Sequence, residues 1–407
     1  MNELSLERAY SRVAIIHVVE SIDDNYGGPA RSIPMLCKGL GEEGFHNVVV
    51  SVDSSSARNT LLKLEGIEWL KARPSTIKIG YFSINLQKLL KQKILALQSQ
   101  NYRVLVHLHS VWSYPSVVVY KVCTSLNIPY ILTPRSSLQI SSLKKSRLIK
   151  TIVGTVFIKK LIANAFIIHV TCKSEEKDFY QNFKHDNLVL IENGLDFSEF
   201  HDLPTKEESI EYFSLANKGK CILFLSRLSE RKGLDLLYDA FQIIKSSGLS
   251  DWQLLIAGPN EDVEIINSIQ KKSLEDGISK SVHYVGMLRG RERLMAFSAA
   301  DLFVLPTKFE NFGMSIAESL AAGLPVITTK DTPWEGVTKL GFGCIASRDS
   351  SSLVDAIKSQ YELGRLESKN TEMLKYVESN YNYRVKAKAL GRHLIKCFST
   401  GAQQNKF

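Results

Sequence analysis

Short apolar runs alternate with helical patterns along most of this chain of 407 residues. Runs rich in Val, Ile and Leu at 13–19, 47–52 and 165–171 are typical of strands that are buried on both faces of a parallel sheet. Parallel neighbours need crossover connections, which the intervening helical patterns can supply. The alternation therefore predicts the α/β class, with parallel sheets covered by helices on both faces.

The pattern is interrupted after Gly194. Residues 197–219 contain a proline and an acidic run, and the alternation restarts with the apolar run at 221–226. A chain of this length can form two domains, each with its own core. We therefore predict two Rossmann-like domains, 1–195 and 196–379, that face each other across a cleft.

Composition narrows the class of protein further. The hydrophobic content of 44% and charged content of 23% are those of a globular chain. The first apolar stretch, at 13–19, is too short for a signal peptide, and no apolar run is long enough to span a membrane. The six cysteines form no CxxC pair, which favours a reducing cytoplasm and makes a structural zinc site unexpected.

Two glutamates follow the apolar run at 301–306. Glu310 lies in the loop after that run, and Glu318 lies in a helix predicted to begin near Met314 and to end at Gly323. The unpaired backbone N–H groups at a helix start favour a phosphate, and a carboxylate beside them can accept hydrogen bonds from sugar hydroxyls. The segment could hold a sugar nucleotide, and an ordinary loop and amphipathic helix are the alternative.

Two basic residues follow another buried run, at 221–226. Arg227 and Lys232 lie between its carboxyl end and the next helix, at the edge where open α/β sheets bind ligands. An arginine can donate two hydrogen bonds to a diphosphate, and a lysine adds a point charge. Either residue alone is typical of a solvated surface, but together with the glutamate loop they favour a nucleotide-sugar site.

Glycines and histidines mark the same edge of the first domain. Gly27 and Gly28 follow the first strand, where they could let the backbone approach a ligand or simply form a tight turn. His107 and His109 lie on one face of the strand at 104–109. A histidine can transfer a proton near neutral pH, and a hydrogen-bonded structural histidine is the alternative of equal weight.

The positive charge is concentrated in one block. Between Trp69 and Ser174 there are 16 Lys and Arg and no Asp or Glu, so the rest of the chain is net negative although the whole carries +9. Within this block, residues 141–166 mix basic and apolar residues at helical spacing. Such a helix can lie on an anionic membrane surface or pack on a core with its basic side in water. Nucleic acid is not an expected partner, because no nucleic-acid-binding motif accompanies the charge.

The motifs together resemble the donor site of retaining glycosyltransferases of family 4, which have the GT-B fold. The match consists of Arg227-x4-Lys232-Gly233 followed by Glu310-x7-Glu318. The resemblance extends along most of the chain, and part of it is typical of a bacterial subgroup that builds surface polysaccharides. The further matching segments are GGPAR (27–31), HLHSVWS (107–113), TPRSSL (133–138), IENGLD (191–196) and DTPWEG (331–336).

The resemblance implies a role for each matching residue. Arg227 and Lys232 would stabilise the negative charge on the departing nucleotide diphosphate, and Glu310 would bind hydroxyls of the donor sugar. Glu318 would hold the ribose, and His109 would lie near the reacting centre. The other donor-binding residues would be Gly27, Gly28, Gly258, Met287, Asn311, Phe312, Gly313 and Met314, and the acceptor-binding residues would be His107, Trp112 and Arg135.

Three features bear on the reaction mechanism. Many family members have a histidine where this chain has Arg135, which cannot act as a base but could hold a phosphate or a sugar. No Asp-x-Asp sequence reads as a metal-binding loop, so we expect neither a metal nor a cofactor. No carboxylate nucleophile for a double displacement is evident. By analogy with the family, the leaving phosphate would help to deprotonate the acceptor hydroxyl.

The implied protein is a cytoplasmic enzyme, peripheral on the inner face of the bacterial plasma membrane. It would move a hexose or N-acetylhexosamine, with retention, from a nucleotide sugar to a polyprenyl-diphosphate-linked oligosaccharide. UDP is favoured as the nucleotide because it is the commonest in the family, and GDP is the alternative. A GT-B sugar-nucleotide epimerase and a catalytically silent sugar-nucleotide-binding protein are the competing hypotheses. In the family the last helix, here 380–398, crosses back to the first domain.

Overall fold

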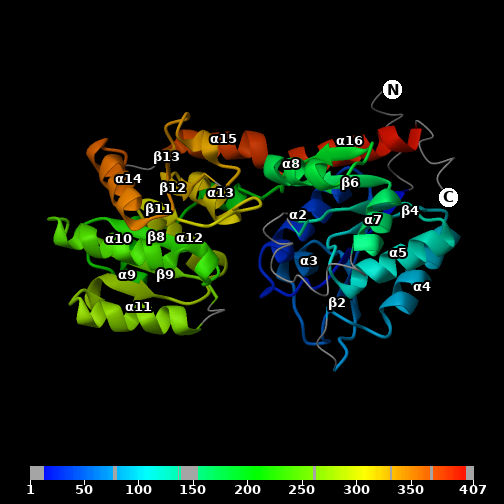
Figure 1. The fold of residues 1–407 in the computed structure, drawn as a ribbon, viewed down its shortest axis with the longest axis horizontal. Helices are drawn as coiled ribbons and strands as arrows, with labels where there is room; N and C mark the ends of the chain where they lie inside the picture. The colour runs from blue at the N-terminus through cyan, green and yellow to red at the C-terminus, as the bar shows by residue number, and fades with distance from the viewer. Residues whose placement is uncertain are drawn as a thin grey trace. The chain divides into compact units, whose positions relative to one another are not determined.

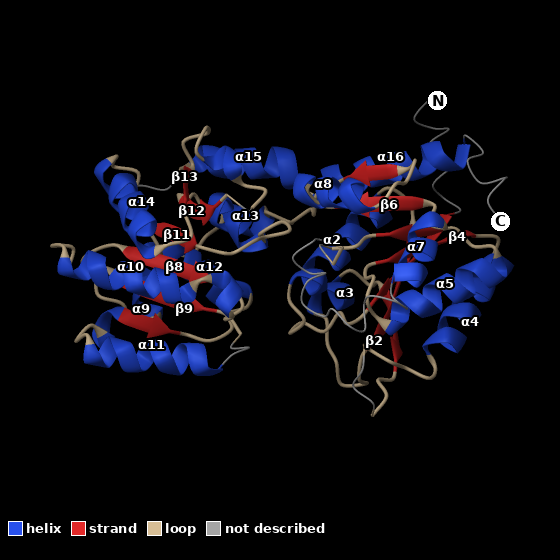
Figure 2. Ribbon diagram, viewed as in Figure 1, coloured by secondary structure: helices blue, strands red, loops and turns tan. Residues whose placement is uncertain are grey.

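The computed structural model describes residues 13–76, 80–135, 137–138, 155–259, 263–330, 332–366 and 370–399. The chain divides into two compact units, shown in Figure 1. The N-terminal unit comprises Met1–Leu195 and Tyr381–Phe407, and the C-terminal unit comprises Asp196–Asn380. Each unit contains a parallel sheet with helices around it (Figure 2), which confirms the predicted α/β class with two Rossmann-like domains.

The N-terminal unit is built on a parallel sheet of seven described strands in the order β3-β2-β1-β4-β5-β6-β7. The strands are β1 (Val13–Val19), β2 (His46–Val52), β3 (Glu68–Ala72), β4 (Arg103–Leu108), β5 (Tyr130–Leu132), β6 (Ile167–Val170) and β7 (Leu188–Leu190). The helices are α2 (Gly28–Glu42), α3 (Thr60–Leu64), α4 (Leu86–Ser99), α5 (Tyr114–Leu126), α7 (Thr155–Ala163), α8 (Lys173–Asn182) and α16 (Tyr383–Ser399).

Both faces of this sheet are buried, because successive side chains of a strand point to opposite faces. Val13 and Ile15 of β1 join a core cluster with Ala387, Leu390 and Leu394 of α16. The alternate β1 residues, including Ala14 and Ile16, join a second cluster with residues of α4, α5 and α7. Helix α16, the last of the described helices, also packs against α2. The apolar runs are therefore continuous because each strand has a hydrophobic layer on either side.

The C-terminal unit has a parallel sheet of six described strands in the order β10-β9-β8-β11-β12-β13. The strands are β8 (Cys221–Leu225), β9 (Gln253–Ala257), β10 (Val282–Tyr284), β11 (Leu302–Leu305), β12 (Val326–Thr329) and β13 (Gly343–Ala346). The α-helices are α9 (Lys206–Tyr212), α10 (Leu234–Ser246), α11 (Val263–Glu275), α12 (Gly290–Ala299), α13 (Met314–Ala321), α14 (Ser350–Glu362) and α15 (Thr371–Tyr381). Short 3-10 turns include η3 (Ser198–His201), η4 (Glu230–Lys232), η5 (Ser279–Ser281) and η6 (Glu335–Val337).

The strand order of each sheet reverses at one place. In the N-terminal unit the chain builds from β1 to β2 and β3 and then returns to place β4 on the other side of β1. In the C-terminal unit β8 and β11 have the same relationship. Connections leave such a pair of strands in opposite directions, which opens a crevice at their carboxyl ends where α/β proteins bind ligands. The loops after β1, β4, β8 and β11 are therefore the places to look for a site.

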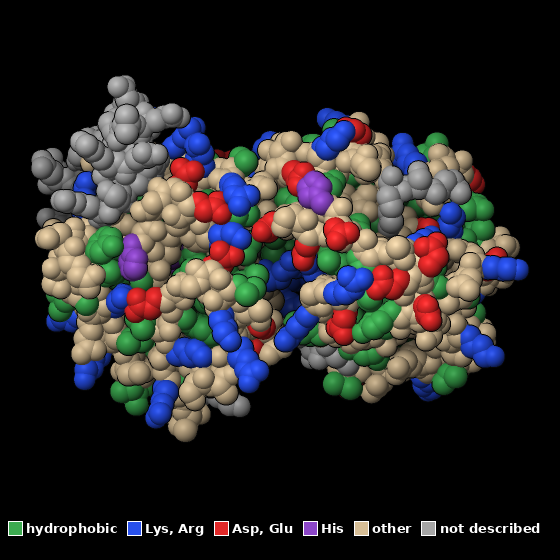
Figure 3. Space-filling view, turned by 180° about the vertical axis from the view of Figure 1, so that it is seen from behind, with side chains coloured by type: hydrophobic (Ala, Val, Ile, Leu, Met, Phe, Trp, Pro, Cys, Tyr) green, Lys and Arg blue, Asp and Glu red, His purple; other side chains and the backbone are tan. Residues whose placement is uncertain are grey.

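Part of the predicted membrane-surface segment 141–166 lies outside the described residues, which omit 139–154. In the described part, Ile158, Leu161 and Ile162 of α7 are buried in the core, and Lys159 and Lys160 are exposed. This part therefore matches the core-facing alternative. Acidic and basic side chains are interspersed over the face of the molecule shown in Figure 3. Among the described helices, none combines the length and apolar character needed to cross a bilayer.

Candidate active site

Two loops meet at the carboxyl ends of β8 and β11 in the C-terminal unit. Lys232 ends the η4 turn that follows β8, and Glu310 lies in the loop between β11 and α13. The Nζ of Lys232 and the Oε1 of Glu310 form an ion pair, although the residues are 78 positions apart in the chain. Because β8 and β11 are neighbouring parallel strands, the loops that leave them come together at one sheet edge.

Backbone contacts hold the two loops together. The backbone N–H of Lys308 donates to the carbonyl oxygen of Arg231 at 2.7 Å. The Arg231 guanidinium lies 5.3 Å from the centre of the Phe309 ring, within range of a cation–π contact. Gly233 has φ +72°, and a Cβ there would lie 2.4 Å from the carbonyl oxygen of Pro306. Glycine is therefore required at this position, for its backbone conformation and for the close approach of the loops.

Basic residues surround the carboxylate of Glu310. Lys232 is only 6% exposed, and burial lowers the pKa of its ammonium group. The carboxylate of Glu310 raises that pKa, while the charges of Arg231 and Arg227 lower it further, so both arginines act on the same place. Arg227 itself is exposed. The two loops together carry four basic residues against two acidic ones, Glu230 and Glu310. Their net positive charge suits a ligand with more than one negative charge.

The start of α13 lies next to this pair in the chain. Gly313 is the N-cap residue, and the first turn of the helix contains no acidic side chain. Phe312 is 3% exposed, and its ring centre lies 5.6 Å from that of Trp334, whose Nε1–H donates to the carbonyl of Phe312. Phe312 therefore shapes the loop from behind, while Asn311 and Met314 are partly exposed. Trp334 lies in the DTPWEG segment, to which the sequence assigned no role; Asp331 of that segment lies outside the described residues.

The carboxylate of Glu318 forms a buried ion pair with a residue outside the loops of Lys232 and Glu310. It is 1% exposed, and its Oε1 lies 2.6 Å from the Nη1 of Arg293 on α12. Arg293 also forms an ion pair with Glu199 of η3. Arg293 could not be predicted from the sequence, because its partners Glu199 and Glu318 are distant in the chain and no local pattern indicates the pairing. A hydrogen bond from Glu318 to a ribose remains a prediction, and it would have to coexist with this buried ion pair.

Replacing Arg293 by methionine should lower the free energy of unfolding of the C-terminal unit by about 3–5 kcal/mol, since the buried Glu318 carboxylate would lose its cationic partner. Urea unfolding followed by hydrogen exchange in α12 and α13 measures this loss. Arg291→Met, on the same helix, removes an exposed ion pair with Glu208 and should change stability little. Equal losses in the two variants would contradict the structural role of Arg293.

Gly258 and Met287 follow β9 and β10 at the same sheet edge. The backbone N–H of Gly258 donates to the carbonyl of Gly286 at 2.7 Å. Gly258 has φ +143°, and a Cβ there would lie 1.8 Å from the carbonyl oxygen of Ser226, so packing alone requires a glycine. Met287 is 37% exposed and borders a surface depression together with Tyr212 and Glu292. Contact of either residue with a nucleotide remains a prediction.

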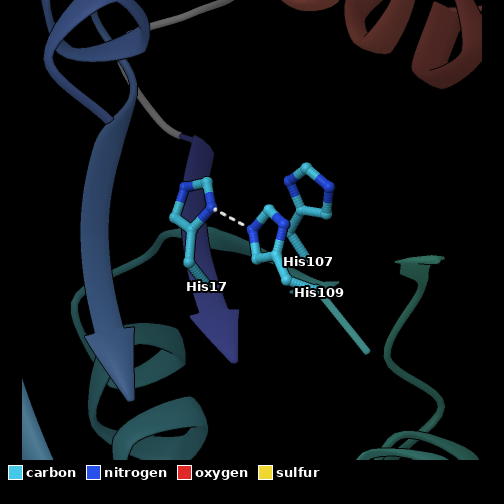
Figure 4. A group of neighbouring side chains, drawn as sticks. All are labelled: His17, His107 and His109. Carbon is cyan, nitrogen blue, oxygen red and sulfur yellow. Dashed lines mark hydrogen bonds between the residues drawn. The ribbon is translucent and has the colours of Figure 1, made fainter. Parts of the chain in front are cut away.

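The N-terminal unit places histidines at its own reversal of strand order (Figure 4). His17 of β1 is in register with His107 of β4, and His109 directly follows β4. The Nδ1 of His17 lies 3.1 Å from the Nε2 of His109, and the ring centres of His107 and His109 are 4.0 Å apart. His169 of β6 is linked to His107 through Thr133. We call the four histidines, His17, His107, His109 and His169, the histidine row.

The hydrogen bonds of the row extend to the predicted acceptor-side residues. The Nη2 of Arg135 lies 3.2 Å from the Nδ1 of His109, and its Nη1 donates to the Oγ of Ser32 on α2 at 3.1 Å. The indole N–H of Trp112 donates to the carbonyl of Ser137 at 2.7 Å, in the same loop as Arg135. Gly27 is the N-cap residue of α2, and Gly28 is the first residue of that helix. Ser136, which lies between Arg135 and Ser137, is outside the described residues.

The histidine row is electrically neutral near pH 7. Burial lowers the pKa of His17 and of His169 to about 4. Burial also lowers the pKa of His107 and of His109 well below the usual value, and Arg135 and the other imidazoles add to the effect. Both ring nitrogens of His109 have hydrogen-bond partners. This geometry is that of a hydrogen-bonded structural histidine, which was the alternative for His109. A base ready to accept a proton would have a free nitrogen.

The row does not fit a metal ion. Ligand atoms of His17, His107 and His109 all lie within 4.8 Å of one another, a spacing that an ion could bridge. However, the guanidinium of Arg135 is hydrogen-bonded to His109 and would repel a cation. The nitrogens of His17 and His109 that face each other are also joined by a hydrogen bond.

The sequence did not single out His17, Asn47 or His169. A signal was present, since His17 and His169 each interrupt an apolar run near the carboxyl end of a strand. A buried polar group in such a run needs a partner, which lies on another strand.

Known proteins share this architecture. The structure superposes on that of Anabaena Alr3699/HepE in complex with UDP and glucose with a TM-score of 0.76 at 16% identity, covering 94% of this chain and 100% of that chain. An uncharacterized glycosyltransferase from Haemophilus influenzae is 24% identical over 77% of this chain and 79% of its own length. Mannosylfructose-phosphate synthase from Agrobacterium fabrum is 30% identical, but the match spans only 35% of this chain and 35% of that enzyme.

Two Rossmann-like units with these strand orders, together with the solved neighbours, define a protein of the GT-B fold. Residues 205–377 match the family profile of the glycosyl transferases group 1. The matched region carries Lys232, Glu310 and Glu318.

Proposed function

We propose that this protein is a retaining glycosyltransferase that uses a nucleotide sugar as donor. The observation that carries the proposal is the ion pair of Lys232 and Glu310 in a group 1 domain, at the sheet edge where its strand order reverses. The UDP bound in the similar Anabaena protein supports a nucleotide donor. UDP is the nucleotide we favour for this chain, with GDP as the alternative.

The geometry suggests how the site would stabilise the leaving group. The Lys232 ammonium has three N–H donors, and the contact with Glu310 uses one of them, so others can reach phosphate oxygens. Arg227 is exposed next to it and could donate two parallel hydrogen bonds. The N–H groups at the start of α13 would add partial positive charge. These groups would neutralise the diphosphate as its bond to the sugar breaks.

Glu310 would have two functions in this mechanism. Its carboxylate holds Lys232 in place, and its remaining lone pairs can accept hydrogen bonds from donor-sugar hydroxyls. Retention would follow if the acceptor attacks from the face that the diphosphate leaves, with the leaving phosphate taking the acceptor proton. The buried, doubly hydrogen-bonded His109 supports a mechanism without a histidine base.

We further propose that the acceptor is a polyprenyl-diphosphate-linked oligosaccharide of bacterial surface polysaccharide synthesis, and that the transferred sugar is a hexose or N-acetylhexosamine. The support is the resemblance of the 107–113 and 133–138 segments to that subgroup and the acid-free block from Trp69 to Ser174. Such an acceptor would bring the protein to the inner face of the plasma membrane. The basic residues of segment 141–166 are the proposed contact with anionic lipid, since the buried apolar residues of its described part face the core.

Assays with a panel of nucleotide sugars and an extract of membrane lipids test the function. Acceptor-dependent release of the nucleotide, with a glycosylated lipid product of retained anomeric configuration, is the expected result. Conversion of the donor without an acceptor would instead indicate an epimerase. Tight donor binding without turnover would indicate a silent binding protein.

Transfer should not require a divalent metal ion, because the cations of the β8 loop can neutralise the diphosphate. We expect the initial rate with EDTA to remain within about twofold of the untreated rate, since no metal would contribute to the transition state. A loss of activity that Mg²⁺ or Mn²⁺ restores would show that this expectation is wrong.

A further inference from the structure

Hydrogen bonds connect Asn47 to Arg135 through His17 and His109. The available donors determine which residue of each pair donates. The Nδ2 of Asn47 donates to the carbonyls of Cys37 at 3.1 Å and Phe45 at 3.0 Å. Its Oδ1 therefore faces His17 as an acceptor, so the Nε2 of His17, 3.1 Å away, carries the proton. A neutral His17 then has an unprotonated Nδ1, which accepts from the Nε2–H of His109.

The proton position on His109 also determines the direction of its hydrogen bond with Arg135. With its proton on Nε2, neutral His109 presents the lone pair of Nδ1 to the Nη2–H of Arg135. Arg135 donates to His109, His109 to His17, and His17 to Asn47. We call these four residues the hydrogen-bond relay. Asn47 sets its direction, because backbone carbonyls fix the orientation of its amide.

A second chain of hydrogen bonds in the same sheet provides a comparison. The Nε2–H of His169 donates to the carbonyl of Ile191 at 2.9 Å, and the Nδ1 of His169 accepts from Thr133. Thr133 accepts from the Nε2–H of His107 at 2.7 Å. The Nδ1 of His107 has no hydrogen-bond partner among the described residues. This second set of hydrogen bonds also joins buried imidazoles, but within the described part of the chain no hydrogen bond connects it to Arg135.

Hydrogen bonds to His109 and Ser32 use two of the five N–H groups of the Arg135 guanidinium. Nη2 is bonded to His109 and Nη1 to Ser32, while the buried Nε–H has no partner within the described part of the chain. The residue is partly exposed, and Ser32 belongs to α2, whose first turn has no acidic side chain. A guanidinium in a fixed plane with unused N–H donors is suited to an oxyanion.

We propose that Arg135 binds a phosphoryl group of the substrate and that Asn47 and His17 are positioning residues, which hold the guanidinium through His109. The proposal rests on the proposed function for the identity of the substrate. The phosphoryl group could belong to the nucleotide sugar or to the polyprenyl diphosphate, which have the same chemistry at this point. Asn47, His17 and His109 are neutral and oriented, so they hold the arginine without adding negative charge. The buried carboxylate of Glu175, which is hydrogen-bonded to Thr171, also acts electrostatically on Arg135.

Binding of inorganic pyrophosphate to the full chain, followed by calorimetry, tests the site without requiring transfer. Arg135→Met and His17→Phe should each weaken binding by about 10-fold or more, because a charge-assisted hydrogen bond is lost or misdirected. The double variant should bind no more weakly than Arg135→Met, since His17 acts only through the arginine. His169→Phe is the matched control and should bind as the wild type does.

Other outcomes would overturn the proposal. Unchanged pyrophosphate binding in Arg135→Met would remove the anion site, even if Lys232 proved essential for transfer. If His17→Phe and His169→Phe weakened pyrophosphate binding equally, the relay would have no specific effect on Arg135 and would only stabilise the fold. If His17→Phe does not fold, nitrogen-15 NMR of the wild type decides the direction: His17 and His109 should both carry the proton on Nε2, and an Nδ1 proton on either would contradict the relay.

Kinetics of Arg135→Lys then identify the source of the phosphoryl group. A lysine keeps the charge but not the planar arrangement of donors. A larger rise in KM for the nucleotide sugar would assign Arg135 to the donor diphosphate, and a larger rise for the lipid acceptor would assign it to the acceptor diphosphate. No rise for either would overturn the assignment to a substrate.

Discussion

Lys232→Met and Glu310→Gln should each reduce sugar transfer by roughly 100-fold or more, since the two residues would stabilise charge that develops in the transition state. The change should appear mainly in kcat. The two side chains are paired and only 8% and 12% exposed, so removing either charge also misplaces the other. The double variant should therefore be little worse than either single variant.

A control in the same loop separates this effect from a general loss of positive charge. Lys308 is exposed, and its described contact with the β8 loop is through its backbone N–H, which substitution preserves. Lys308→Met should therefore transfer sugar at close to the wild-type rate. Turnover by Lys232→Met or Glu310→Gln within about threefold of wild type would deprive that residue of its proposed role. Unfolding midpoints of all variants would show whether a loss reflects the fold or the chemistry.

The N-terminal unit should lose much of its stability in mild acid. His17 and His169 have pKa values of about 4 when folded, whereas an unfolded histidine titrates near 6.5. The unfolded chain therefore binds more protons as the pH falls through 6.5 towards 4, and stability falls with it. From about pH 7.5 to about pH 5, each of these two histidines should cost about 2 kcal/mol. His107 and His109, with pKa values well below the usual value, act in the same direction.

Urea-dependent hydrogen exchange in β1 and β4, analysed by mass spectrometry at both pH values, measures this loss for the N-terminal unit alone. His169→Phe supplies the control, because removing one such histidine should reduce the pH dependence by one proton, or about 1.4 kcal/mol per pH unit. An unfolding free energy that is equal at both pH values would mean that the imidazoles titrate normally and are not buried as described.

Some of the site could be predicted because parallel sheets obey simple rules. Arg227 and Lys232 follow one apolar run and Glu310 follows another, and carboxyl ends of neighbouring parallel strands meet at one edge. The meeting of Lys232 with Glu310 therefore required only that the two strands be adjacent. The start of α13 could be predicted from the glycine before it and the apolar pattern after it.

Other partners could not be predicted, because they depend on strand register and on helix packing. His109 was a candidate for proton transfer, but it lies against His17, which is 92 positions away on a strand that pairs with β4 in one particular register. The resemblance implies that Glu318 contacts a ribose, whereas in the structure its carboxylate forms an ion pair with Arg293 on α12. No local pattern indicates either contact, since each joins elements that meet only when the domain is folded.

The order of residues along the chain was enough to determine the α/β class and the loops that carry charge, because periodicity and strand ends are local properties. The tertiary structure alone decided which charges neutralise one another and which nitrogen of each imidazole carries a proton. Those outcomes depend on burial and on distances of about 3 Å, which arise only when separate strands and helices are packed together.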